Sequence, residues 1–271
     1  MSLRDTIRLL DNKGKRSQAP RMTTASVPIA HAGNPVPAAP VSYRNAHWYF
    51  LAALAAIVAG FWPSFFRPLG AGDAGHTLHG VTATLWVVLL VVQSWLMSRG
   101  YVAWHRRVSR LAFVVLPVLI VSALHMVAAM MVNPEMPPFL PPLLAFIDLP
   151  SLLFLLLLVG LALWNVRTPA AHKRFMSATV FLGFPPALTR LYARLFEPQL
   201  GFIGALHGSF LTVEVILLAL IVADRQAGER RLAYPLSLMF FVTVHALMMP
   251  IGASGWWGTF VRWYAELPLF S

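Results

Sequence analysis

Cysteine is absent from this 271-residue sequence, and its absence excludes several kinds of redox site. Without thiols the chain cannot form disulfide bonds, thiolate metal centres or iron–sulfur clusters. It also cannot attach haem covalently in the manner of c-type cytochromes. A metal or haem site in this chain would have to use other ligands, with histidine foremost among them.

Charged residues are also scarce, at 11% against 58% hydrophobic residues, and the mean hydropathy is +0.67. This composition is typical of an integral membrane protein. A spanning helix needs about 20 mainly apolar residues. The predicted spans are 46–65, 76–98, 108–132, 142–165, 172–196, 203–223 and 234–251. The fifth is the least apolar, because it contains Pro185, Pro186 and Arg190. We therefore predict an all-α, polytopic protein with seven transmembrane helices.

Acidic residues number only 10 against 21 basic ones, which gives a net charge of +11. The basic residues cluster before the first span and in alternate loops, and the intervening loops have few. This is the positive-inside pattern, and it explains the charge without a nucleic-acid partner. We expect a multi-pass protein of the bacterial inner membrane, in contact with the lipid bilayer, with a cytoplasmic N-terminus and a periplasmic C-terminus.

The chain is expected to have three regions. Residues 1–44 are polar and basic and predict a mobile cytoplasmic tail. Residues 45–251 form the membrane domain with its seven helices. Residues 252–271 include the pairs Trp256-Trp257 and Trp263-Tyr264, which favour a short interfacial segment at the periplasmic surface.

Four histidines recur in two matching segments. The first segment contains Leu78-His79-Gly80, Gly100, Arg106-Arg107 and His125, and the second contains Leu206-His207-Gly208, Gly228, Arg230-Arg231 and His245. In both segments, 20 residues separate the glycine of the triplet from the later glycine. This predicts a duplicated two-helix hairpin, with the four histidines at similar depth near the outer surface. Imidazoles inside a membrane are costly unless paired or coordinated, which indicates a functional site.

Four other polar residues fall in the same outer half of the predicted spans: Asp148, Arg190, Arg194 and Glu214. Gln93 lies outside that half, and it follows His79 and Trp86 at seven-residue spacing. His207 and Glu214 are also seven residues apart, so they share a helix face. We expect Arg190 and Arg194 to anchor an anionic group and Glu214 to be a proton or second-shell partner. A purely structural pairing of Glu214 with Arg190 is the alternative.

Haem b is the first candidate cofactor, because it needs axial imidazoles, an apolar slot between helices and basic groups near its propionates. His79, His125, His207 and His245 are the predicted ligands. The pattern resembles the transmembrane cytochromes b, which implies electron transfer or a quinone-linked oxidoreductase component. However, the four predicted ligands share the outer side of the membrane. A second haem near the cytoplasmic side would therefore need His47, His105 or His172. The stretch from His79 to His125 also resembles an uncharacterised bacterial family of multi-span proteins, which implies no particular activity.

Two other functions stay open. The same four histidines, with methionines such as Met130 and Met249 nearby, would suit copper or another metal in transport or insertion. Alternatively, the protein is a cofactor-free structural or assembly subunit of a larger membrane complex, and its histidines make hydrogen bonds to protein groups or to a quinone.

Overall fold

The computed structural model describes residues 45–69 and 74–269. The chain divides into two units, Met1–Val36 and Pro37–Ser271, and the first lies wholly outside the described residues. The predicted tail, 1–44, is therefore not among them either. All the regular elements of the described residues are helical, as the sequence predicts. They are α2 (Ala46–Phe61), the π-helix η3 (Trp62–Phe66), α3 (Ala74–Ser98), α4 (Val102–Val108), the 3-10 helix η4 (Ser109–Leu111), α5 (Ala112–Met131), α6 (Leu140–Trp164), α7 (Pro169–Ala178), the 3-10 helix η5 (Thr179–Gly183), α8 (Phe184–Gln226), α9 (Ala233–Gly252) and α10 (Gly255–Ala265).

Six helical segments in the described part are long and apolar enough to cross a membrane. They are Ala46–Phe66, Ala74–Ser98, Val102–Met131, Leu140–Trp164, Pro198–Gln226 and Ala233–Gly252. These segments overlap six of the seven predicted spans, so a multi-pass membrane protein is confirmed. The remaining predicted span, 172–196, is divided among α7, η5 and the start of α8. It does not reach the length and apolarity of a span as one helix, because it is polar and interrupted.

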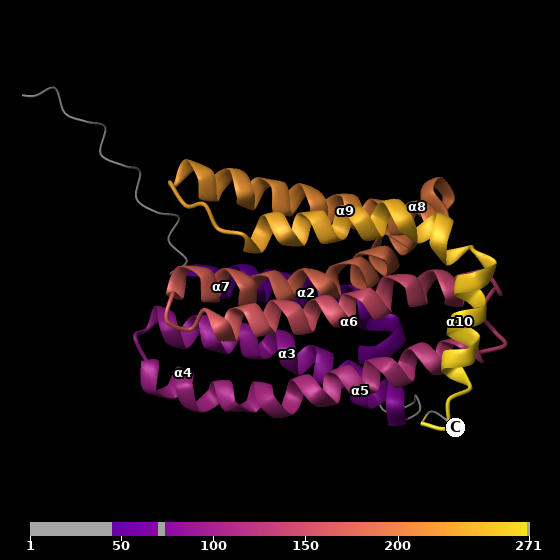
Figure 1. The fold of residues 1–271 in the computed structure, drawn as a ribbon, viewed down its shortest axis with the longest axis horizontal. Helices are drawn as coiled ribbons and strands as arrows, with labels where there is room; N and C mark the ends of the chain where they lie inside the picture. The colour runs from indigo at the N-terminus through magenta and orange to yellow at the C-terminus, as the bar shows by residue number, and fades with distance from the viewer. Residues whose placement is uncertain (1–44, 70–73, 270–271) are drawn as a thin grey trace, which may run out of the picture. The chain divides into compact units, whose positions relative to one another are not determined.

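Helix α8 has a break in its backbone between two limbs. Phe196 (φ −133°, ψ 26°) and Gly201 (φ 57°, ψ −176°) leave the helical region there. A positive φ is disfavoured for residues with a Cβ, so glycine suits position 201. The limb before the break packs against α2, where a Cβ on Gly60 would meet the backbone of Ala187. The limb after the break runs beside α9 (Figure 1).

Two helical hairpins end their first helices in the same way. After α3, the Gly100 N–H donates to the carbonyl of Met97 at 3.1 Å and the Tyr101 N–H to that of Leu96 at 2.9 Å. After α8, the Gly228 N–H donates to Arg225 at 3.0 Å and the Glu229 N–H to Asp224 at 2.8 Å. Both are Schellman motifs, which need a left-handed residue, and φ is 75° at Gly100 and 74° at Gly228. The two turns therefore match, while duplication of the whole hairpins stays a prediction.

Helix α10 runs across the ends of α5 and α6, at a steep angle to both (Figure 1). The Trp257 indole donates to the carbonyl of Pro142 at 2.8 Å, and the Tyr264 hydroxyl donates to the carbonyl of Leu124 at 2.8 Å. Burial raises the pKa of Tyr264 to about 12. Trp256 and Trp263 are exposed, at 64% and 57%. Such a helix suits the interfacial role expected for 252–271.

Candidate functional site

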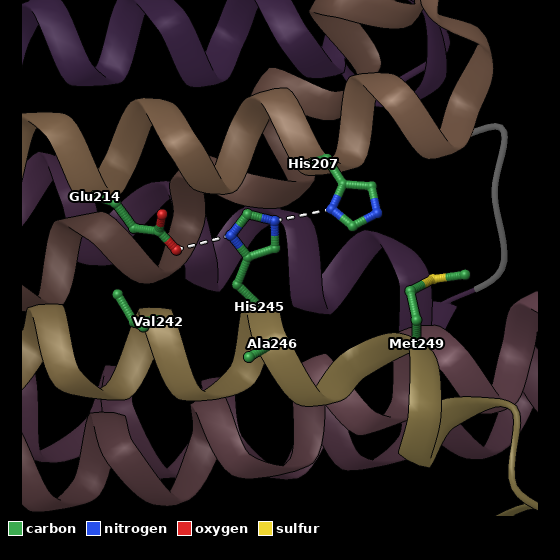
Figure 2. A pocket seen from close by; sticks show the side chains of 6 residues that line it. All are labelled: His207, Glu214, Val242, His245, Ala246 and Met249. Atoms are coloured by element: carbon green, nitrogen blue, oxygen red, sulfur yellow. Dashed lines mark hydrogen bonds and ion pairs between the residues drawn. The ribbon is translucent and has the colours of Figure 1, made fainter.

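Three of the sequence-predicted residues form one hydrogen-bonded chain between α8 and α9. His207 Nδ1 lies 2.8 Å from His245 Nε2, and His245 Nδ1 lies 2.8 Å from Glu214 Oε1 (Figure 2). We call Glu214, His245 and His207 the α8–α9 relay. Glu214 and His245 are largely enclosed, with 14% and 15% of their side chains exposed. Glu214, predicted to be a proton or second-shell partner, therefore contacts His245 directly.

The sequence places these side chains together through helix geometry and the turn between the helices. Glu214 follows His207 by seven residues, which is almost two full turns, so both project from the same face of α8. The turn at Gly228 reverses the chain, and α9 returns beside α8. His245 then lies between the two α8 residues and contacts both. Phe210, only 1% exposed, stacks on the His245 ring at a centroid distance of 5.1 Å and fixes its plane.

The directions of the two hydrogen bonds depend on the protonation state of Glu214, and its carboxylate form gives one consistent arrangement. An ionised carboxylate only accepts, so His245 Nδ1–H donates to it and His245 Nε2 is left as an acceptor. His207 Nδ1–H then donates to His245 Nε2, which leaves the lone pair of His207 Nε2 at the end of the chain. That nitrogen lies on the far side of the His207 ring from His245 (Figure 2). His207 Nε2 is therefore the position at which this arrangement accepts a hydrogen bond.

A pocket of about 440 Å³ opens beside the α8–α9 relay. Its lining consists of His207, Glu214, Val242, His245, Ala246 and Met249 (Figure 2). Its size falls in the range of about 300–1,000 Å³ that is usual for small-molecule sites. The site therefore combines a hydrogen-bonded chain of titratable side chains with apolar walls.

The four repeated histidines do not form one centre. Among the described residues, no three His, Asp or Glu side chains are placed to hold one metal ion. His207 and His245 contact each other from the second hairpin, whereas His79 belongs to α3 and His125 to α5 of the first. His79 Nδ1 is buried and has no hydrogen-bond partner among the described residues. His47 Nδ1, at the start of α2, is in the same condition.

Arg190 and Arg194 are occupied by protein groups. The Arg190 guanidinium lies 4.5 Å from the ring centre of Phe61, donates to the carbonyl of Pro186 at 2.9 Å, and lies near enough to Asp148 for their charges to interact. Glu214 instead accepts from His245, so the structural pairing of Glu214 with Arg190 is wrong. Arg194 donates to the backbone carbonyl of Ala59, where it satisfies a carbonyl at the end of α2. Their predicted role as anion anchors is untested.

Gln93 and two further histidines lie at the other end of the spans and make local contacts. In the amide orientation that satisfies both of its ends, Gln93 donates to His105 and accepts from the Ser109 N–H at 2.8 Å. Gln93 therefore connects α3 to α4 and η4. His172 Nδ1 lies 2.8 Å from the carbonyl of Ala162. These contacts fit structural roles for Gln93 and His172.

Haem can be tested against these positions. Two axial nitrogens on opposite faces of an iron would be about 4 Å apart, given metal–nitrogen bonds of about 2 Å. His207 Nδ1 and His245 Nε2 are 2.8 Å apart and point at each other, so this pair does not fit a haem held between them. His79 fits better, because a buried polar atom without a partner requires an explanation such as an ion, a water or a cofactor.

Sequence reasoning missed the pocket walls and one buried ion pair. Val242 lies three residues before His245 and Met249 four after it, so helical spacing identifies both once His245 is chosen. Ala246 is the next residue after His245, and this spacing does not identify it. Arg174 makes two bonds of 2.7 Å to Asp224, with side-chain exposures of 2% and 7%. The partner of Arg174 is 50 residues away in the chain, and no local pattern identifies it.

Comparison of the chain with family models, with curated proteins and with solved structures finds no match.

Proposed function

We propose that this integral membrane protein contains an acid–base centre, the α8–α9 relay, which accepts a proton at His207 and stores it on Glu214. The observation that supports it is the continuous chain Glu214–His245–His207, with two contacts of 2.8 Å, beside a pocket. Ordinary packing histidines hydrogen-bond to the nearest backbone carbonyl, as His172 does. A chain of three titratable groups costs more to bury, and such groups inside a membrane mark functional sites.

The transfer balances without a lasting charge on either ring. A proton binds His207 Nε2, the proton of His207 Nδ1 moves to His245 Nε2, and the proton of His245 Nδ1 moves to Glu214. Both imidazoles end neutral in the opposite tautomer, and Glu214 changes from carboxylate to carboxylic acid. The net charge of the relay therefore changes from −1 to 0.

We also propose seven crossings, with the N-terminus in the cytoplasm of a bacterial cell and the C-terminus in the periplasm. The distribution of basic residues supports this orientation. Residues 169–195, in α7, η5 and the first limb of α8, would make the additional crossing. At 1.5 Å per residue this stretch is roughly 40 Å long, which is enough to span a bilayer. Its polar residues are tolerable there because Arg174, Thr179 and Thr189 are buried within the protein.

A second candidate function is haem b binding in the first hairpin, and the partnerless Nδ1 of buried His79 favours it. Haem would supply one-electron chemistry there. His79 would help to hold the haem, and His125, on the helix that packs against α3, is the other histidine of that hairpin. The copper alternative has no observation in its favour beyond the residue types. The cofactor-free subunit shares the contacts of His207 with His245 and of His245 with Glu214, because these are hydrogen bonds of histidines to protein groups.

The relay can be tested by infrared difference spectroscopy of the full-length protein in lipid nanodiscs during a pH titration. We expect the carboxylic acid C=O band of Glu214, assigned by its loss in Glu214→Gln, to change together with the imidazole bands. His245→Phe should uncouple them, whereas His125→Phe should not. A Glu214 band that titrates in His245→Phe as it does in the wild type would overturn the proposal.

A further inference from the structure

The pocket beside the α8–α9 relay faces the apolar exterior of the protein. On α8, Leu211 and Leu218 lie on the same helix face as His207 and Glu214, and each is 53% exposed. On α9, Val242 and Met249 flank His245 and are 47% and 38% exposed. Both helices are membrane-capable by length and composition. The open side of the pocket is therefore directed to lipid.

This position limits the kind of molecule that can reach His207. A charged, water-soluble solute would have to be desolvated in the bilayer, at a cost of several kcal/mol per unpaired group. A lipid-soluble molecule already partitions into that region. Val242, Ala246 and Met249 supply apolar contacts, and the thioether of Met249 adapts to irregular shapes.

The hydrogen-bonding requirement of the relay narrows the class of possible ligands further. With Glu214 ionised, the free position at the end of the chain is the His207 Nε2 lone pair, which accepts and does not donate. The complementary group is an acidic hydroxyl rather than a carbonyl or an ether. A hydroxyl on an aromatic ring is such a donor, and a flat ring suits a pocket of about 440 Å³ between two helices.

We propose that the pocket binds a lipid-soluble molecule with a hydroxyl-bearing ring, of the quinol class, which enters from the bilayer and donates its hydroxyl to His207 Nε2. This inference rests on the proposed relay, because the orientation of its hydrogen bonds makes His207 an acceptor. The bound hydroxyl would be the group whose proton the relay takes.

The test uses the full-length protein in nanodiscs with ¹⁵N-labelled histidine. The probes are tetramethylhydroquinone and its dimethyl ether, which has the same ring but no hydroxyl to donate. We expect saturable binding of the hydroquinone and a shift of the His207 Nε2 resonance, and no such shift with the ether. Equal shifts with both probes would overturn the inference, because they would indicate apolar partition alone.

Variants locate the binding and separate this inference from the proposed function. Val242→Trp fills the pocket from an exposed position, and we expect it to weaken hydroquinone binding at least tenfold while the coupled titration of Glu214 persists. Leu218→Trp places the same new side chain at an exposed position of α8 outside the pocket lining, and this variant should bind normally. Ala246→Leu repeats the pocket test with a smaller change. If the hydroquinone does not bind to the wild type while the Glu214 and imidazole bands still titrate together, the proposed ligand class is wrong and the proposed relay stands. If these bands titrate separately in the wild type, both proposals are wrong.

Discussion

The first and second hairpins have matching turns but differ in residue type at two equivalent positions. Fourteen residues before the turn glycine, the second hairpin has Glu214 and the first has Trp86. Glu214 accepts a hydrogen bond from His245, whereas the Trp86 indole donates to the Thr179 hydroxyl at 3.1 Å. An indole N–H cannot accept. The same offset therefore places a hydrogen-bond partner of His245 in one hairpin and a helix-to-helix contact in the other.

The position four residues before the turn glycine shows the second difference. The first hairpin has Leu96 there, 6% exposed, and the second has Asp224, 5% exposed. Leu96 needs only apolar neighbours, but Asp224 is buried with a charge and requires Arg174. A shared backbone pattern thus fixes where a side chain points, and the residue type decides what it does.

The largest expected effect comes from removing Asp224. Asp224→Ala leaves the Arg174 guanidinium buried without its partner, and breaking such a pair costs about 3–5 kcal/mol. We expect this loss in the free energy of unfolding, measured by denaturation of the purified protein in detergent micelles. The double variant Arg174→Met with Asp224→Leu should recover most of it, because no charge stays buried. A loss under about 1 kcal/mol in Asp224→Ala would show that the pair is solvated.

An optical spectrum of the protein and its variants would show which of the two hairpins binds haem. Protein purified from cells supplied with a haem precursor should show a reducible b-type spectrum if the first hairpin holds haem. His79→Ala should then remove the band, because it removes a ligand. His245→Phe should leave the band, since His245 is occupied in the relay. A band lost in His245→Phe and kept in His79→Ala would reverse the comparison.

The turn glycines should respond alike. Gly100→Ala and Gly228→Ala each place a Cβ at a φ near 75°, a conformation that costs about 1–2 kcal/mol for residues other than glycine. Within the described part of the chain, either new Cβ would meet no atom within 4 Å beyond its immediate neighbours, so the cost is purely conformational. Unfolding free energies of the two variants should agree within about 0.5 kcal/mol. A larger disagreement would limit the likeness of the hairpins to their hydrogen bonds.

The smallest expected effect is that of Trp86→Phe. It keeps most of the buried aromatic surface and loses the hydrogen bond to Thr179, which is worth about 0.5–1.5 kcal/mol. The coupled titration of Glu214 should be unchanged, because Trp86 belongs to the other hairpin. Thermal unfolding measures the first quantity, and infrared titration measures the second. An altered titration would indicate that the two hairpins act as one unit.

The sequence predicts the helical class and six of the spans because long apolar segments have few structures available in a bilayer. It predicts the contact of Glu214 with the histidines less directly, through seven-residue spacing on α8. It does not predict that His207 and His245 pair while His79 stays apart. That outcome depends on how the two hairpins pack, and packing is decided by non-local contacts such as those of Trp86 with Thr179 and Arg174 with Asp224.

The stacking of Phe210 on His245 has a consequence for how often the relay can act. After one transfer both rings are in the opposite tautomer, and a second proton can follow the same direction only if each ring rotates to restore its starting hydrogen. Phe210, only 1% exposed, holds the His245 plane and opposes that rotation. The proposed relay would therefore take up one proton and release it reversibly through His207, and it would not conduct protons continuously from one end to the other.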